Sequence, residues 1–169
     1  MEARSLRFVA TACCGEQLGG SPETRVHRVC TDSRQMQAGD LFFALPGGRF
    51  DGHAFVRQAA EKGAGAVVVE RKRVPAGWSG CAMIAVKDTR KALGRLASTY
   101  REDFALPLVA VGGSNGKTTT KELVASVLRQ KVATLWREAS FNNDIGVPLT
   151  LLRLEKSHQV AVLEAGTNH

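Results

Sequence analysis

Short apolar runs alternate along this chain with segments in which apolar residues recur every three or four positions. The first pattern is typical of buried strands and the second of amphipathic helices. Strands are predicted at residues 26–30, 41–45, 66–69, 81–86, 108–111, 132–135 and 160–163, and helices begin near residues 6, 51, 88 and 117. This alternation predicts an α/β fold.

Two of these segments carry more specific expectations. The run at residues 108–111 is short and uniformly apolar, as in a parallel strand that is buried on both faces. The helix over residues 117–130 is expected to turn one apolar stripe inward, formed by Leu123, Val124, Val127 and Leu128.

Composition indicates a folded globular protein, with 44% apolar and 23% charged residues. The longest uncharged stretches, residues 74–86 and 104–116, are shorter than a bilayer span and contain proline and glycine, so no membrane span is predicted. The first residues lack the pattern of a signal peptide. A cytoplasmic location is therefore expected.

The formal net charge of +7 raises the possibility of nucleic-acid binding. However, the basic residues are dispersed, their longest run is Arg71–Arg73, and only one Tyr and two Trp are available for stacking. A solvated basic surface that suits small anionic substrates is favoured over a nucleic-acid partner. The four cysteines form no C-x-x-C pair, which favours free thiols over a metal or redox site.

A glycine-rich turn joins the apolar run at 108–111 to the following helix, and its residues are Gly113, Ser114, Asn115, Gly116, Lys117, Thr118 and Thr119. Backbone amides in such a turn, together with the helix N-terminus, form a binding site for phosphate. Lys117 can reach the terminal phosphates and Thr118 offers a hydroxyl to Mg²⁺. Val111 stands where the common phosphate-loop pattern has glycine, so an ordinary strand-to-helix turn is the alternative.

The segment Gly112-Gly-Ser-Asn-Gly-Lys-Thr-Thr-Thr120 resembles the ATP-binding loop of the Mur ligase family, which also lacks that glycine. This family builds the peptide of bacterial cell walls. Residues 31–34, 39–45 and 48–53 resemble the UDP-sugar-binding domain of its E-type and F-type members, and residues 141–148 and 162–169 resemble the F-type.

The resemblance implies an ATP-dependent ligase that joins D-alanyl-D-alanine to UDP-N-acetylmuramoyl-tripeptide through an acyl phosphate, with ATP and Mg²⁺. It implies a small N-terminal α/β substrate domain at residues 1–86, followed at residues 87–169 by the first part of a P-loop-type parallel-sheet ATPase domain. The resemblance also implies longer central and third domains, so a chain ending at His169 is expected to be inactive alone. An E-type or folylpolyglutamate-type ligase and a non-catalytic nucleotide-binding module remain alternatives.

The resemblance also implies residue roles. The loop residues 113–119 would bind ATP, with Lys117 as the catalytic residue, and Thr118 and Glu164 would hold Mg²⁺. An exposed loop glutamate is the alternative for Glu164. Substrate contacts are expected from Ser33, Arg34, Arg49, Asn142 and Asn143, although residues 31–34 could serve only as a turn, and paired asparagines are common turn residues. The oligomeric state is not predicted.

Overall fold

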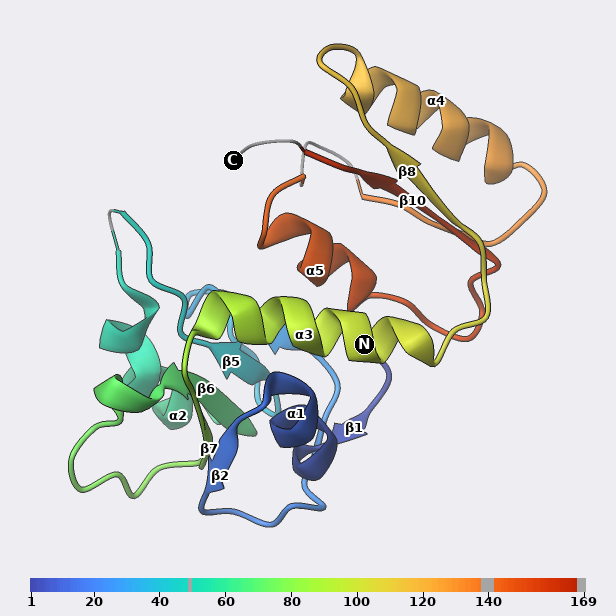
Figure 1. Ribbon diagram of the computed structural model, residues 1–169. Helices are drawn as coiled ribbons and strands as arrows, with labels where there is room; N and C mark the ends of the chain where they lie inside the picture. The colour runs from blue at the N-terminus through green and yellow to red at the C-terminus, as the bar shows by residue number, and fades with distance from the viewer. Residues whose placement is uncertain (49, 138–141, 167–169) are drawn as a thin grey trace. The chain divides into compact units, whose positions relative to one another are not determined.

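The computed structural model describes residues 1–48, 50–137 and 142–166, which form two compact units, Met1–Leu96 and Ala97–His169 (Figure 1). Each unit contains its own sheet, fully parallel in the second unit and parallel except for one edge strand in the first. The domain boundary expected after residue 86 lies earlier in the chain than this division and stays a prediction.

The first unit is built on a five-stranded sheet in the order β2-β7-β6-β5-β4. Its parallel strands are β4 (Val29–Cys30), β5 (Leu41–Phe43), β6 (Ala66–Glu70) and β7 (Ala82–Val86), and β2 (Glu16–Leu18) pairs antiparallel with β7. Every residue of β5, β6 and β7 is buried, as expected when helices cover both faces of a parallel sheet. The helical segments of this unit are α1 (Leu6–Cys13), η1 (Gly52–Phe55), α2 (Val56–Glu61), η2 (Arg71–Arg73) and the first part of α3 (Thr89–Glu102).

The single strand predicted at residues 26–30 is wrong, because this segment forms two short strands in different sheets. Val26 belongs to β3 (Arg25–Val26), which pairs antiparallel with β1 (Arg4–Ser5), whereas Val29 belongs to β4 beside β5. Between the two strands, the side chain of Arg28 turns to the buried carboxylate of Asp40. Both ends of this segment do form strands, but they pair with different strands, β1 and β5, which are distant from each other in sequence.

The second unit contains a three-stranded parallel sheet in the order β8-β10-β9. Its strands are β8 (Leu108–Val111), β9 (Thr134–Leu135) and β10 (Val160–Glu164), and its helices are α4 (Lys117–Leu128), α5 (Gly146–Leu151) and the last part of α3. Within this unit α4 and α5 both contact β10, and the Tyr100 hydroxyl donates to the Leu154 carbonyl over 2.6 Å. The sequence patterns had not indicated α5.

Two expectations of burial in this unit are wrong. The stripe expected in α4 is wrong at Leu123 and Val127, which are 62% and 69% exposed, while Val124 and Leu128 are half-buried. The buried residues of α4 are Lys121 and Ala125. Residues 121 and 125 lie one turn apart on one face, and residues 123 and 127 lie on nearly the opposite face. The strand β8, an edge strand of the described sheet, is exposed at three of its four residues, so the expected burial on both faces is wrong. None of the helices in the described ranges has the length and hydrophobicity needed to span a bilayer.

Candidate functional site

The glycine-rich turn between β8 and α4 contains two backbone positions that favour glycine. Gly113 has φ = 141° and Gly116 has φ = 73°, and such positive values favour glycine because other residues are strained there. Gly116 stands at the N-cap of α4, and because it has no side chain it leaves the first amides of the helix without a side-chain cap. Those amides and the positive end of the helix dipole can bind an anion.

Lys117 lies across this loop. Its ammonium donates to the carbonyl oxygen of Gly113 over 2.8 Å and approaches that of Ser114 at 3.4 Å. These contacts hold the positive charge of Lys117 against the backbone of the loop, at the N-terminus of α4. A polyphosphate bound to the loop amides would meet this charge directly.

Glu164 ends β10 and is only 4% exposed. One of its oxygens, Oε2, accepts a hydrogen bond from the Thr118 hydroxyl over 2.8 Å, and the other, Oε1, accepts one from the Asn142 side-chain amide over 2.8 Å. The structure therefore places Thr118 beside Glu164, as the expected pair requires, and adds Asn142, which had been expected to contact substrate. The alternative that Glu164 is an exposed loop residue is wrong.

The oxygen donors at this point suit Mg²⁺. This ion typically takes one or two carboxylates with substrate phosphates and keeps several waters, rather than an all-protein cage. A buried carboxylate beside a threonine hydroxyl, next to a phosphate-type loop, provides that donor set. Across the described ranges no group of three or more His, Cys, Asp or Glu side chains is placed to hold a metal.

Asn143 has a different environment from its neighbour. Its Oδ1 accepts hydrogen bonds from the amide of Gly146 over 2.7 Å and from that of Ile145 over 3.2 Å. These bonds satisfy donors at the start of α5, as N-terminal capping residues do. The contacts of Asn143 that the structure describes are therefore local, and its expected substrate contact stays a prediction.

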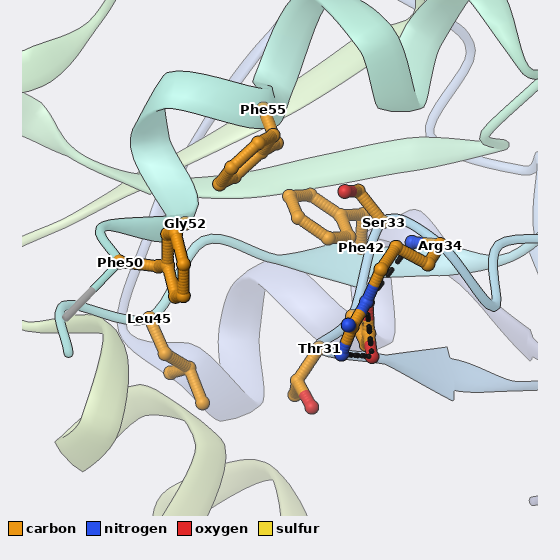
Figure 2. A pocket seen from close by; sticks show the side chains of 9 residues that line it. Thr31, Ser33, Arg34, Phe42, Leu45, Phe50, Gly52 and Phe55 are labelled. Atoms are coloured by element: carbon orange, nitrogen blue, oxygen red, sulfur yellow. Dashed lines mark hydrogen bonds and ion pairs between the residues drawn. The ribbon is translucent and has the colours of Figure 1, made fainter.

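A cavity of about 340 Å³ lies in the first unit (Figure 2). One side is the segment after β4, and the other is formed by aromatic and aliphatic residues; the lining residues are Thr31, Asp32, Ser33, Arg34, Phe42, Leu45, Phe50, Gly52 and Phe55. The predicted residues Ser33 and Arg34 thus share one cavity. Arg49 lies outside the described residues.

Arg34 is oriented by Asp32. Its guanidinium donates to both carboxylate oxygens, over 2.7 Å to Oδ2 and 2.9 Å to Oδ1, and these bonds lower the pKa of Asp32 to about 2 (Figure 2). Ser33 is buried, and the Lys62 ammonium donates to its backbone carbonyl over 2.7 Å. Residues 31–34 are therefore a hydrogen-bonded turn and at the same time a cavity wall.

His53 secures the opposite wall. Its Nε2 accepts from the backbone amide of Glu70 over 3.0 Å, so the proton of the neutral ring lies on Nδ1, which donates to Asp51 over 2.7 Å. Burial alone would raise the pKa of Asp51, but hydrogen bonds from the backbone and ring of His53 and from Arg73 lower it. Asp51 also caps η1, the short helix that carries Gly52 and Phe55 into the cavity wall.

Sequence reasoning missed the aromatic part of this cavity. Phe42, Phe50 and Phe55 all line it; Phe42 and Phe50 lie within the segments 39–45 and 48–53 that had been singled out by resemblance, but no role had been assigned to their rings. The close spacing of these aromatics around a glycine-rich turn was the available signal. Sequence reasoning also missed Lys121. Its buried ammonium donates to the Arg137 carbonyl over 2.6 Å.

Residues 25–101 match the family model described as the Mur ligase family, catalytic domain, and residues 111–169 match the Mur ligase middle domain. The chain belongs to the Mur ligase family. The resemblance seen in the sequence is thereby confirmed.

Individual Mur ligases agree with both the sequence and the fold. The UDP-N-acetylmuramoyl-tripeptide–D-alanyl-D-alanine ligase of Haemophilus influenzae is 45% identical over 161 residues, which cover 90% of this chain and 34% of that protein. A MurF crystal structure from Acinetobacter baumannii has a TM-score of 0.91 and 43% identity, covering 100% of this chain and 37% of its own. MurF from Thermotoga maritima, solved in complex with ADP, has a TM-score of 0.73 and 33% identity over 82% of this chain and 32% of its own.

The predicted α/β fold is thus confirmed by solved structures. The chain spans about a third of the length of the Mur ligases it matches, since it covers 34% of the Haemophilus protein and 37% of the Acinetobacter chain.

Proposed function

We propose that the protein containing this chain is an ATP-dependent ligase that joins D-alanyl-D-alanine to UDP-N-acetylmuramoyl-tripeptide in the cytoplasm. The observation that carries the proposal is the meeting of Thr118 and Glu164 beside the Lys117 loop. Similarity to ligases of this specificity supports the choice of substrates.

ATP is assigned to the second unit. The amides of residues 113–119 would hold its phosphates, and Lys117 would neutralise the charge that develops on the transferred phosphoryl group. Thr118 and Glu164 would hold Mg²⁺, which when bound supplies further neutralisation of the phosphate oxygens. Positioning and charge are what phosphoryl transfer requires from a protein, and these residues provide both.

The UDP part of the other substrate is assigned to the cavity in the first unit. Phenylalanine rings offer flat apolar surfaces to a heterocyclic base, and the planar fork of Arg34 matches phosphate oxygens. Arg49 would add a second basic contact, and Ser33 a polar one. In the second unit, Asn142 and Asn143 would contribute polar contacts to the substrate.

The chemistry follows from the poor reactivity of a carboxylate. The terminal carboxylate of the tripeptide attacks the γ-phosphorus of ATP, ADP leaves, and an acyl phosphate results. The amine of D-alanyl-D-alanine then attacks the carbonyl carbon, phosphate leaves, and the new amide bond forms. Loss of the amine proton to a base completes the step.

The proposal is tested in the complete reading frame that contains this chain. Calorimetry measures the affinity for Mg-ADP of Lys117→Ala, with Lys131→Ala as a control because Lys131 is exposed and lies beyond the end of α4. Loss of charge-assisted hydrogen bonds that stabilise by about 3 kcal/mol in total weakens binding by about 100-fold. Lys131→Ala should bind normally.

A second measurement tests the reaction. Phosphate release from ATP in the presence of UDP-N-acetylmuramoyl-tripeptide should depend on D-alanyl-D-alanine and not on L-alanine. Turnover without D-alanyl-D-alanine, or unchanged nucleotide affinity in a folded Lys117→Ala protein, refutes the proposed function.

A further inference from the structure

Asn142 and Asn143 are identical in chemistry and adjacent in the chain, yet their side chains do different things. The amide nitrogen of Asn142 donates to Oε1 of Glu164 over 2.8 Å, whereas Oδ1 of Asn143 accepts from the first amides of α5. Of the two, Asn142 contacts Glu164, the residue that also accepts from Thr118. The paired asparagines therefore separate into one residue directed at Glu164 and one that caps a helix.

The two oxygens of Glu164 are held from two separate elements. Oε2 accepts from the hydroxyl of Thr118 at the start of α4, and Oε1 accepts from Asn142, which precedes α5. A glutamate side chain has three rotatable bonds, so hydrogen bonds at both oxygens restrict the direction in which either oxygen points.

Asn142 is itself fixed against the end of β10. The Gly166 amide donates to the Asn142 carbonyl over 3.1 Å, and a Cβ at position 166 would lie only 2.4 Å from that carbonyl oxygen. Asn143, next in the chain, accepts from the Gly146 amide at the start of α5, which packs on β10. The position of Asn142 along the strand end is therefore set by its backbone as well as its side chain.

We propose that Asn142 is a positioning residue that acts through Glu164. By holding Oε1 it keeps Oε2 directed toward the Thr118 hydroxyl, and it thereby raises the affinity for the Mg²⁺ that accompanies the nucleotide. This inference rests on the proposed function. Hydrogen-bond partners of metal ligands typically change metal affinity by about 10–100-fold when they are removed.

The test measures the affinity for ADP by calorimetry at a series of Mg²⁺ concentrations and in EDTA, using the complete reading frame. Asn142→Ala should raise by at least about 10-fold the Mg²⁺ concentration at which half of the increase in ADP affinity is reached. The affinity for ADP in EDTA should stay unchanged. Gln159→Ala is the matched control, because this side-chain amide accepts from the Ala133 backbone amide over 3.1 Å and precedes β10, whereas Glu164 ends it. It should leave the Mg²⁺ dependence unchanged.

A double-mutant cycle separates action through Glu164 from a direct contact with nucleotide. In a Glu164→Gln background, Asn142→Ala should add no further shift, because the carboxylate that it positions is gone. Should Asn142→Ala fold poorly, Asn142→Leu keeps the shape of the side chain, removes the donor, and is expected to give the same shift.

Three results overturn the inference. An unchanged Mg²⁺ dependence, an equal shift in the Glu164→Gln background, or an equal loss of affinity in EDTA would each show that Asn142 does not act through Glu164. These results leave the proposed function intact if the unaltered protein binds Mg-ADP. Failure of the unaltered protein to bind ADP at any Mg²⁺ concentration refutes both.

Discussion

Replacement of His53 by Phe should destabilise the first unit and loosen one wall of its cavity. The imidazole connects the end of β6 to the segment before η1, because it accepts from the Glu70 amide and donates to Asp51. Phenylalanine keeps the size of the ring and removes both interactions. The backbone amide of Glu70 would then lie against carbon.

The size of the effect follows from these contacts. A buried backbone N–H that loses its acceptor costs about 1–3 kcal/mol. Asp51 keeps the His53 backbone amide and Arg73, and its side chain is 33% exposed, so losing the ring donor adds only about 1 kcal/mol. The expected loss is about 2–4 kcal/mol, out of a typical total of about 5–15 kcal/mol, so the variant should still fold.

The assay combines urea unfolding, followed by circular dichroism, with hydrogen exchange at the Glu70 amide. His158 offers a matched control, because its ring also accepts a backbone N–H over 3.0 Å, from Glu155, but at an exposed position. His158→Phe should change stability by no more than about 0.5 kcal/mol. His53→Gln should recover part of the loss, since its amide oxygen can accept from Glu70.

The reasoning is refuted if His53→Phe is no more destabilising than His158→Phe. It is also refuted if exchange at the Glu70 amide is unchanged while the variant is destabilised, because the loss would then arise elsewhere.

Three other perturbations have defined outcomes. Gly52→Ala places a Cβ 2.7 Å from the amide nitrogen of Leu45, so urea unfolding should show a loss of about 1–3 kcal/mol in the free energy of unfolding. At Gly48 a Cβ meets nothing within 4 Å, so Gly48→Ala should leave that free energy unchanged. Arg34→Ala should raise the pKa of Asp32 from about 2 toward its ordinary 3.8, measured by NMR titration; the lowered pKa stabilises the fold above pH 4, and that stability is lost as the pH falls toward 2. Because burial raises the pKa of Cys13 to about 12, mass spectrometry after iodoacetamide treatment at pH 8 should show its exposed neighbour modified and Cys13 modified only on unfolding.

Much of the fold was predictable because its main strands are short, continuous apolar runs. The predicted strands at 41–45, 66–69, 81–86, 108–111 and 160–163 all occur, with ends displaced by no more than two residues. Local pattern was insufficient where pairing depends on distant partners. The strands β1 and β2 have two and three residues, and they are defined only by their contacts with β3 and β7.

Burial was harder to predict than secondary structure. The helix α4 carries apolar residues on two sides, and the choice between them depends on the sheet that it meets. A lysine was not expected inside, yet Lys121 is buried because its ammonium reaches a backbone carbonyl. The strand–turn–helix arrangement around residues 113–119 was readable from the sequence, whereas the Asn142–Glu164 hydrogen bond joins segments that only the folded chain brings together.

The contacts of Lys117 bear on which anions the loop would select. Because its ammonium already bonds to the Gly113 carbonyl, any phosphate that takes this charge must replace an internal hydrogen bond. A single inorganic phosphate or sulfate would exchange that hydrogen bond for one other, so the net gain in binding free energy would be small. A nucleoside triphosphate meets the loop amides and the ammonium with linked phosphate groups, so each contact raises the effective concentration for the next. The loop would therefore bind ligands with several linked phosphate groups in preference to single phosphate or sulfate ions.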